Sequence, residues 1–359
     1  MSLKRLTRFI HRYEKQLSVA AMVGGFILDS LTLRRVDLLA DNLVIIVYLL
    51  VAGISIAALD LRHTRMLTHR WFAWMVTVAP IAMQFVFGGL FSSFVVFYLR
   101  SASLSASWPF IGFLVVMLVG NEAFRPYYER LVFHVTVLFL AVLSYSIFLV
   151  PILVGALGTH VFLLSVVVSI AFITAFLAFL SIFAPERIRE ERATIVRSIA
   201  FTIILVVLAY AANVIPPIPL SLKDSAVAYG VVREGDTYQL SVEQPSFAER
   251  LGLVQSYNRA PAQGVSVWTS VFAPTALSIP IIHVWQHREG ETWVTMSRIS
   301  FPISGGRDGG YRGYSTKTNI LPGAWRVSVE TPNGQVIGRV RFDITDKAGD
   351  VAAVSTETR

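Results

Sequence analysis

Two histidines and a tryptophan alternate in the segment IIHVWQH, as His283, Trp285 and His287. In a β-strand, residues two positions apart point to the same face, so these three side chains share one side. A metal ion would need at least a third ligand, for which Glu289 is the nearest candidate, and the turn expected at Gly290 works against it. A structural ladder of histidine and tryptophan rings is the favoured interpretation. We therefore predict no metal site and keep His283 and Trp285 as candidate binding residues.

A second set of side chains follows the glycine-rich segment GGRDGGYRG and combines arginine, lysine and tyrosine. Guanidinium and aromatic groups together suit a sugar ring, an anionic polymer or a peptide. Charged side chains on a solvated strand are the alternative interpretation. The glycines lack the G-x-x-x-x-G-K-[ST] spacing of a phosphate-binding loop. The candidate binding residues of this segment are Tyr311, Arg312, Tyr314 and Lys317.

Residue patterns typical of enzymes are missing from the sequence. It contains neither a G-x-S-x-G elbow nor an H-E-x-x-H metal motif. The chain has no cysteine, which excludes disulfides, thiolate metal ligands and cysteine nucleophiles. We therefore favour a non-enzymatic protein, with no catalytic residues and no cofactor.

The candidate binding residues lie in a C-terminal region whose apolar residues recur with period two, as in half-buried strands. The segments YQLSVEQ, GVSVWTSVF, IIHVWQH, TWVTMSRISFPI, AWRVSVET and VIGRVRFDI alternate or nearly alternate. Asn333-Gly334 predicts a two-residue hairpin turn that joins Trp325, Val327 and Val329 to the strand from Val336 to Phe342. Six or seven short strands favour an all-β immunoglobulin-like sandwich.

The N-terminal region is apolar enough for a membrane. The whole chain of 359 residues is 54% hydrophobic with a mean hydropathy of +0.61, and its long apolar runs all precede Ser221. We predict a bundle of about seven transmembrane helices. The third run contains Pro80 and Gly88-Gly89, and is either one kinked helix or a crossing followed by an interfacial helix. The runs are 17–33, 43–59, 71–99, 109–124, 131–157, 161–184 and 198–215.

Lysine and arginine fall unevenly on the loops between these runs. With the N-terminus inside, the inner segments hold 14 of them, whereas the outer loops hold only Arg34, Arg35 and Arg100. Cytoplasmic loops collect basic residues, so this split places the N-terminus in the cytoplasm and the C-terminal domain outside. For a bacterial inner membrane, the outside is the periplasm.

Four polar residues fall within or beside the apolar runs, where charges are costly and usually have a partner. Each also has an ordinary interpretation, at the interface or as a hydrogen-bonded structural side chain. A transporter or lipid-handling enzyme with its site among them is the alternative function. The sequence shows no internal repeat, which argues against transport. The four intramembrane candidates are Asp29, Arg100, Glu122 and His134.

Composition also sets the domain limits. We expect a transmembrane domain over 1–215, a proline-rich linker over 216–225, a β-sandwich domain over 226–345 and a flexible tail over 346–359. The net charge of +8 belongs mainly to residues 1–220, which carry 17 Lys/Arg against 10 Asp/Glu. The β-domain has no basic face interleaved with aromatics, so we expect no nucleic-acid binding.

The C-terminal region resembles a known family. The segments YNRAP (257–261), HVWQHREGE (283–291), YRGYSTKT (311–318) and LPGAWRVSVETPNGQVIGRVRFDI (321–344) are similar to the bacterial domain of unknown function 2914. The membrane part resembles the multi-pass region that precedes this domain in some members. The resemblance implies an inner-membrane protein with a β-rich domain, and implies no activity, substrate or catalytic residue.

Taken together, these patterns predict an inner-membrane protein that presents a periplasmic β-domain as a binding or scaffolding module. The expected partners are the lipid bilayer, an envelope protein or glycan and, as a possibility, further copies of the chain.

Overall fold

Contacts divide the computed structural model into two units, and each is described by itself. The first contains most of residues 1–215, and the second contains 216–359 with two short segments, 101–106 and 152–159. The structure describes residues 26–27, 29–31, 33, 38–61, 70–101, 104–123, 130–215, 220–235, 237–243, 255–259, 264–273, 278–304, 310–318, 320–346 and 354–359.

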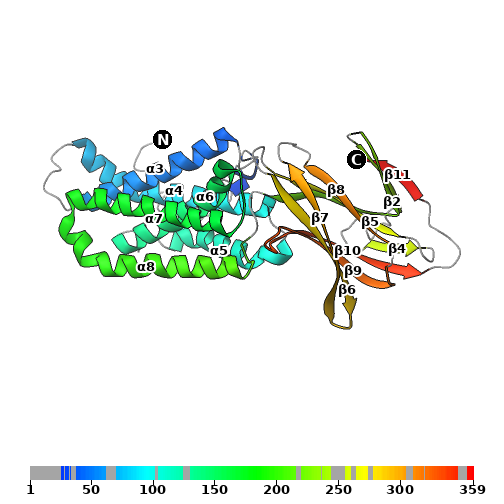
Figure 1. Cartoon of the computed structure of the whole chain (residues 1–359). Helices are drawn as coiled ribbons and strands as arrows, with labels where there is room; N and C mark the ends of the chain where they lie inside the picture. The colour runs from blue at the N-terminus through cyan, green and yellow to red at the C-terminus, as the bar shows by residue number, and fades with distance from the viewer. Residues whose placement is uncertain are drawn as a thin grey trace. The chain divides into compact units, whose positions relative to one another are not determined.

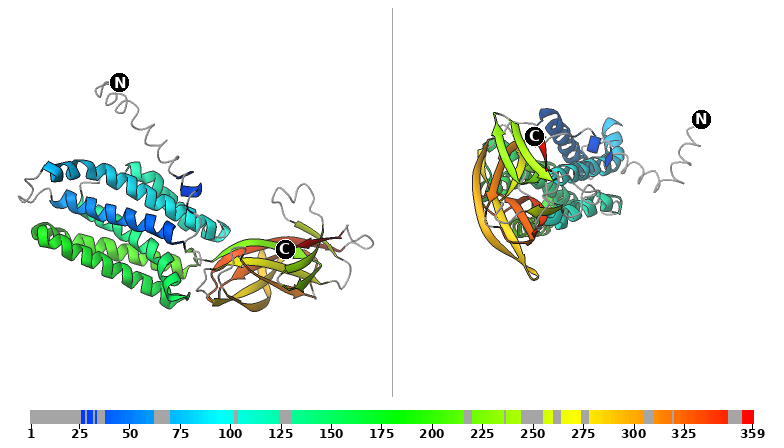
Figure 2. Two further views of the ribbon diagram at one scale, coloured as in Figure 1. Left: turned by 90° about the horizontal axis from the view of Figure 1, so that it is seen from above. Right: turned by 90° about the vertical axis from the view of Figure 1, so that its right-hand side faces the viewer.

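The first unit is helical, and its helices run roughly side by side (Figure 1; Figure 2). Five of the described helices are long and apolar enough to cross a membrane, namely α3, α4, α6, α7 and α8. Their bounds, with that of α5, are α3 Leu39–Leu61, α4 Arg70–Ser101, α5 Leu104–Ala123, α6 Leu131–Val154, α7 Thr159–Phe183 and α8 Pro185–Ala211.

The helices differ from the predicted runs at two places. The run 17–33 falls largely outside the described residues. The run 109–124 corresponds to α5, whose apolar stretch, Trp108–Gly120, is shorter than a membrane span. The run 71–99 is one continuous helix, α4, despite Pro80 inside it. Seven crossings therefore remain a prediction, with five supported by length and composition.

Close packing and one ion pair hold the helical unit together. A Cβ on Gly89 of α4 would lie 2.6 Å from the ring of Tyr48 on α3, so a side chain there would displace that ring or its helix. At the end of α3, the carboxylate of Asp60 is 4% exposed and lies 2.8 Å from the guanidinium of Arg187 in α8. Gly89 is thus explained by its close contact with Tyr48 of α3.

The second unit consists of three β-sheets. A three-stranded sheet has the order β1-β5-β8, a five-stranded sheet the order β4-β10-β9-β6-β7, and a small sheet the order β11-β3-β2. The β4–β10 pair is parallel and the other pairs are antiparallel. The strands are β1 Ser221–Ala228, β2 Gly230–Glu234, β3 Thr237–Glu243, β4 Gln255–Arg259, β5 Val265–Phe272, β6 Ser278–Glu289, β7 Thr292–Ser304, β8 Tyr311–Lys317, β9 Gly323–Glu330, β10 Val336–Asp346 and β11 Val354–Thr358.

One hydrophobic core lies between the first two sheets. It combines Val267 of β5 with Trp285, Val327 and Phe342 of the five-stranded sheet, all of them fully buried. The alternating apolar residues that predicted the strands are therefore the ones that face this core. The region is β-rich, as expected, and the immunoglobulin-like assignment remains a prediction.

Strands also form where the sequence predicts a linker and a tail. β1 begins at Ser221, inside the expected linker, and pairs with β5. β11 lies inside the expected tail and pairs with β3. The guanidinium of Arg359, after β11, forms an ion pair with Asp224 of β1. Both strands pair with segments far away in the sequence, so local pattern does not reveal their order.

Candidate functional site

The candidate residues His283 and Trp285 lie inside the core. His283 is fully buried, with Nε2 2.9 Å from Thr269 Oγ1 and Nδ1 2.8 Å from Ser315 Oγ. The indole N–H of Trp285 donates to the same Ser315 Oγ at 2.9 Å. Burial lowers the pKa of His283 to about 3, so the ring is neutral at physiological pH. These two side chains join the sheets and present no atom to a ligand.

The remaining candidates of the β-domain lie on β8, in the other sheet. Tyr311, Arg312 and Lys317 are half-buried and Tyr314 is exposed. The Lys317 ammonium lies 5.9 Å from the centre of the Trp325 ring, and Tyr314 contacts Tyr238 edge to face. The four side chains are spread along the strand beside different neighbours.

The intramembrane candidates are described only in part. His134 is 2% exposed inside α6, and Asp29 is half-buried in a short helical segment. The side chains of Arg100 and Glu122 lie outside the described residues. Whether the four form a site therefore stays a prediction.

A different surface gathers the functional groups, on the five-stranded sheet opposite the core. Residues that alternate with the core positions carry arginines: Arg326 on β9, Arg339 and Arg341 on β10, Arg288 on β6 and Arg298 on β7. We call these five residues the arginine face. Arg326 and Arg341 are direct cross-strand partners, which places their Cβ atoms about 5 Å apart.

Acidic groups offset part of this charge, namely Glu330 within the face and Glu291 and Asp343 beside it. Oε2 of Glu330 on β9 lies 3.6 Å from Nη2 of Arg298, and burial raises the pKa of the Glu330 carboxyl. Burial also lowers the pKa of Arg326, and the neighbouring charges of Arg339 and Arg341 lower it further. Like charges on facing strand positions destabilise a sheet. The arginine face is thus a cluster of positive charges that an anion would stabilise.

Contacts within the sheet hold one arginine in place. Arg326 Nε donates to Gln286 Oε1 at 2.6 Å, and its guanidinium lies 4.5 Å from the centre of the Trp293 ring. Arginine stacked on an indole is positioned by both a cation–π contact and a hydrogen bond. Two further residues of the arginine face, Arg288 and Arg341, are exposed to solvent.

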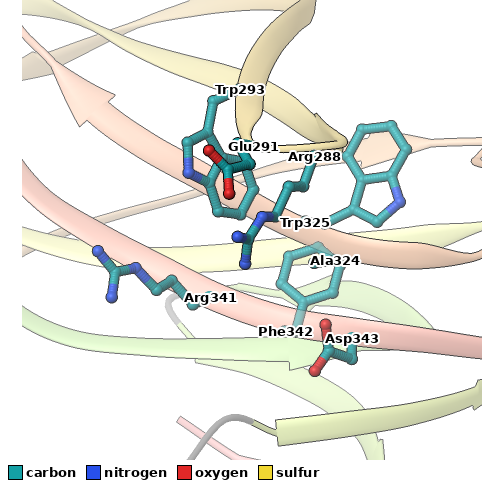
Figure 3. A pocket seen from close by; sticks show the side chains of 8 residues that line it. All are labelled: Arg288, Glu291, Trp293, Ala324, Trp325, Arg341, Phe342 and Asp343. Carbon is teal, nitrogen blue, oxygen red and sulfur yellow. The ribbon is translucent and has the colours of Figure 1, made fainter.

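A cavity of about 340 Å³ opens beside the arginine face. This volume is at the lower end of the range for small-molecule pockets, which is about 300–1,000 Å³. Figure 3 shows Arg288, Glu291 and Trp293 reaching it from the β6–β7 hairpin, and Arg341, Phe342 and Asp343 from β10. Trp325 and Ala324 of β9 complete its lining, so the cavity has two guanidinium groups, two carboxylates, two indoles and a phenyl ring around it.

The expectation that the β-domain has no basic face interleaved with aromatics is therefore wrong, since Trp293 lies among these arginines. Sequence reasoning missed this surface, although part of its signal was available. The predicted hairpin register already places Arg326 opposite Arg341. The approach of Trp293 and Arg288 depends on the pairing of β6 with β9, which no local pattern reveals. Among the described residues, no group of three or more His, Asp or Glu side chains is placed to hold a metal ion.

Comparisons with known proteins show a similarity to one family in the C-terminal region and indicate no activity. No curated protein matches the chain. The solved structure of Pseudomonas fluorescens alkylpurine DNA glycosylase AlkC, bound to DNA containing an abasic site analog, aligns over 78% of this chain and 82% of that chain. The identity is 10% and the TM-score 0.19, a similarity too low to indicate a shared fold.

The match to a family model is specific to the β-domain. Residues 279–344 match the family described as "Protein of unknown function (DUF2914)", as the resemblance predicted. This range contains all five residues of the arginine face and the cavity residues named above. The C-terminal region of this chain is therefore similar to the DUF2914 family over 66 of its 359 residues.

Proposed function

We propose that this protein is a bacterial inner-membrane protein that presents its β-domain in the periplasm as a binding module for an envelope partner, either a protein or a polysaccharide. The observation that carries the proposal is the arginine face with its adjoining cavity, because positive groups gathered on one sheet face are costly to the fold alone and suit a ligand. The helical unit would anchor the domain.

The membrane location draws support from the surface of the helices. Large apolar side chains on α8 are exposed, among them Phe201, Ile204 and Leu208. Only 11% of its apolar span is buried, against 78% for α6. An exposed helix of this composition suits lipid contact. The periplasmic side is supported by the excess of lysine and arginine on the predicted inner loops.

Topology has a direct test, because the chain contains no cysteine. We expect a single cysteine at Thr292, exposed in the β6–β7 hairpin, to react with a membrane-impermeant maleimide in spheroplasts. A cysteine at Glu190, exposed on α8 in a predicted inner segment, should react only after the membrane is permeabilised. Labelling at Glu190 but not at Thr292 in intact spheroplasts would show that the orientation is reversed.

Binding is tested by photo-crosslinking in cells. A benzophenone amino acid at Thr295 or Arg341, both exposed on the proposed binding surface, should capture a discrete partner that mass spectrometry identifies. The control position is Arg233, which is exposed on β2 in the separate small sheet. Equal adducts at all three positions would contradict a binding role for the arginine face. The same conclusion would follow if no position formed an adduct while a control envelope protein crosslinked normally.

A further inference from the structure

We infer that the arginine face and its cavity bind a polysaccharide that carries carboxylate groups, such as a uronic-acid polymer. This inference rests on the proposed binding function and names the chemistry of the partner. The first step is charge. Arg288 and Arg341 line the cavity with exposed guanidinium groups, and each can bind a carboxylate through two parallel hydrogen bonds.

The second step is the aromatic group of the cavity. Trp293 is half-buried on β7, directly opposite Arg288 across the hairpin. The guanidinium of Arg326 covers one face of the Trp293 ring at 4.5 Å. An indole held in this way offers a rigid, apolar surface. The C–H groups on one side of a sugar ring form a complementary surface for it.

The third step separates a glycan from an acidic peptide. The cavity also contains the carboxylates of Glu291 and Asp343. Carboxylates only accept hydrogen bonds, and the hydroxyl groups around the edge of a sugar ring can donate to them. Glutamate or aspartate side chains offer only acceptors, so they can pair with the guanidinium groups but give these two carboxylates no donor. A neutral sugar would satisfy these carboxylates but leave the arginine face without its anion.

The geometry of the sheet extends the site beyond the cavity. Arg339 and Arg341 are two residues apart on β10, about 7 Å along one face. Arg326 lies opposite Arg341 on the neighbouring strand. A chain with a carboxylate on successive sugar rings can contact the cavity with one ring and this row of guanidinium groups with the next. We therefore expect a polymer to bind more tightly than a single uronic acid.

The test uses the full chain in detergent micelles and measures the binding of tetragalacturonate by isothermal titration calorimetry. Maltotetraose serves as the neutral oligosaccharide and hexaglutamate as the acidic peptide. We expect binding of tetragalacturonate alone. Arg341→Gln and Trp293→Ala should each weaken it about tenfold or more, the effect of losing one charge-assisted or aromatic contact. Arg233→Gln, an exposed arginine in the small sheet, should leave the affinity within about twofold.

Four outcomes would overturn the inference. These are no binding of tetragalacturonate, equal binding of maltotetraose, tighter binding of hexaglutamate, or equal losses for Arg233→Gln and Arg341→Gln. A partner captured by photo-crosslinking at Arg341 together with any of these results would leave the binding function in place and reject only the uronic-acid chemistry. Circular dichroism of each variant establishes that a lost affinity is not lost folding.

Discussion

Acidification from pH 7.5 to 4.5 is expected to destabilise the β-domain through His283. The neutral ring fits its two partners: one nitrogen donates to a hydroxyl oxygen and the other accepts from a hydroxyl. A charged ring would present two N–H donors, while Ser315 Oγ already accepts from Trp285. Burial lowers the pKa of His283 to about 3, well below its ordinary value of about 6.5.

The direction of the effect follows from proton linkage. Between about pH 3 and 6.5 the unfolded chain binds a proton at His283 that the folded chain does not. The contribution of the neutral His283 ring to the free energy of unfolding is therefore fully present above pH 6.5. It is lost progressively as the pH falls below that value. At pH 4.5 the loss is on the order of 2–3 kcal/mol, since one pKa unit corresponds to about 1.4 kcal/mol.

Thermal unfolding of the full chain, followed by near-ultraviolet circular dichroism of its tryptophans, measures this loss. We expect His283→Gln to be less stable than the unmodified protein at pH 7.5 but to show a smaller decrease in Tm between pH 7.5 and 4.5. His160→Gln removes an exposed histidine of α7 and should keep the full decrease. If the Tm of His283→Gln falls between pH 7.5 and 4.5 as much as that of the unmodified protein, then carboxyl groups, and not this histidine, cause the pH dependence.

The β9–β10 hairpin shows how far the sequence determines the fold. Alternation correctly predicts that Trp325 faces Phe342 and that Val327 faces Val340. The predicted two-residue turn is wrong, because Thr331 and Gln335 close a three-residue loop in which Gly334 has a φ of +79°. Pro332 has no N–H to pair in the shorter turn. A bulge between Val336 and Gly338 then restores the register of the pattern.

Local pattern predicts which face of a strand is buried, but not what lies on the other face. In AWRVSVET and VIGRVRFDI the apolar residues predict the core side, and alternation alone assigns no role to the arginines between them. The gathering of these arginines beside Trp293 depends on the pairing of β6 with β9 and on the contact of Trp293 with Arg326. Both contacts join segments more than 30 residues apart in sequence. The buried role of His283 depends likewise on β5 and β8, whose Thr269 and Ser315 supply its partners.

Gly310, directly before β8, also has an explanation in contacts with a segment distant in sequence. Gly310 has a φ of +82°, a conformation that side chains rarely adopt. A Cβ there would clash with Ser270 Oγ and would lie 3.0 Å from the carbonyl carbon of Val271 and 3.2 Å from the amide nitrogen of Phe272. The last two atoms belong to the backbone of β5, the strand that pairs with β8. This glycine therefore allows two strands to approach, and does not form a phosphate loop.

Gly310→Ala should accordingly destabilise the β-domain by about 3–5 kcal/mol, because backbone strain and a clash with the β5 backbone add together. The matched control is Gly290→Ala in the β6–β7 turn, where φ is +61° and nothing lies within 4 Å of the added Cβ. Strain alone should cost about 1 kcal/mol there. Adding Ser270→Gly to Gly310→Ala should recover part of the lost Tm, since it removes one clashing atom and leaves the backbone contacts. Equal decreases in Tm for the two alanine variants, with no recovery in the double variant, would show that β5 and β8 do not approach this closely at Gly310.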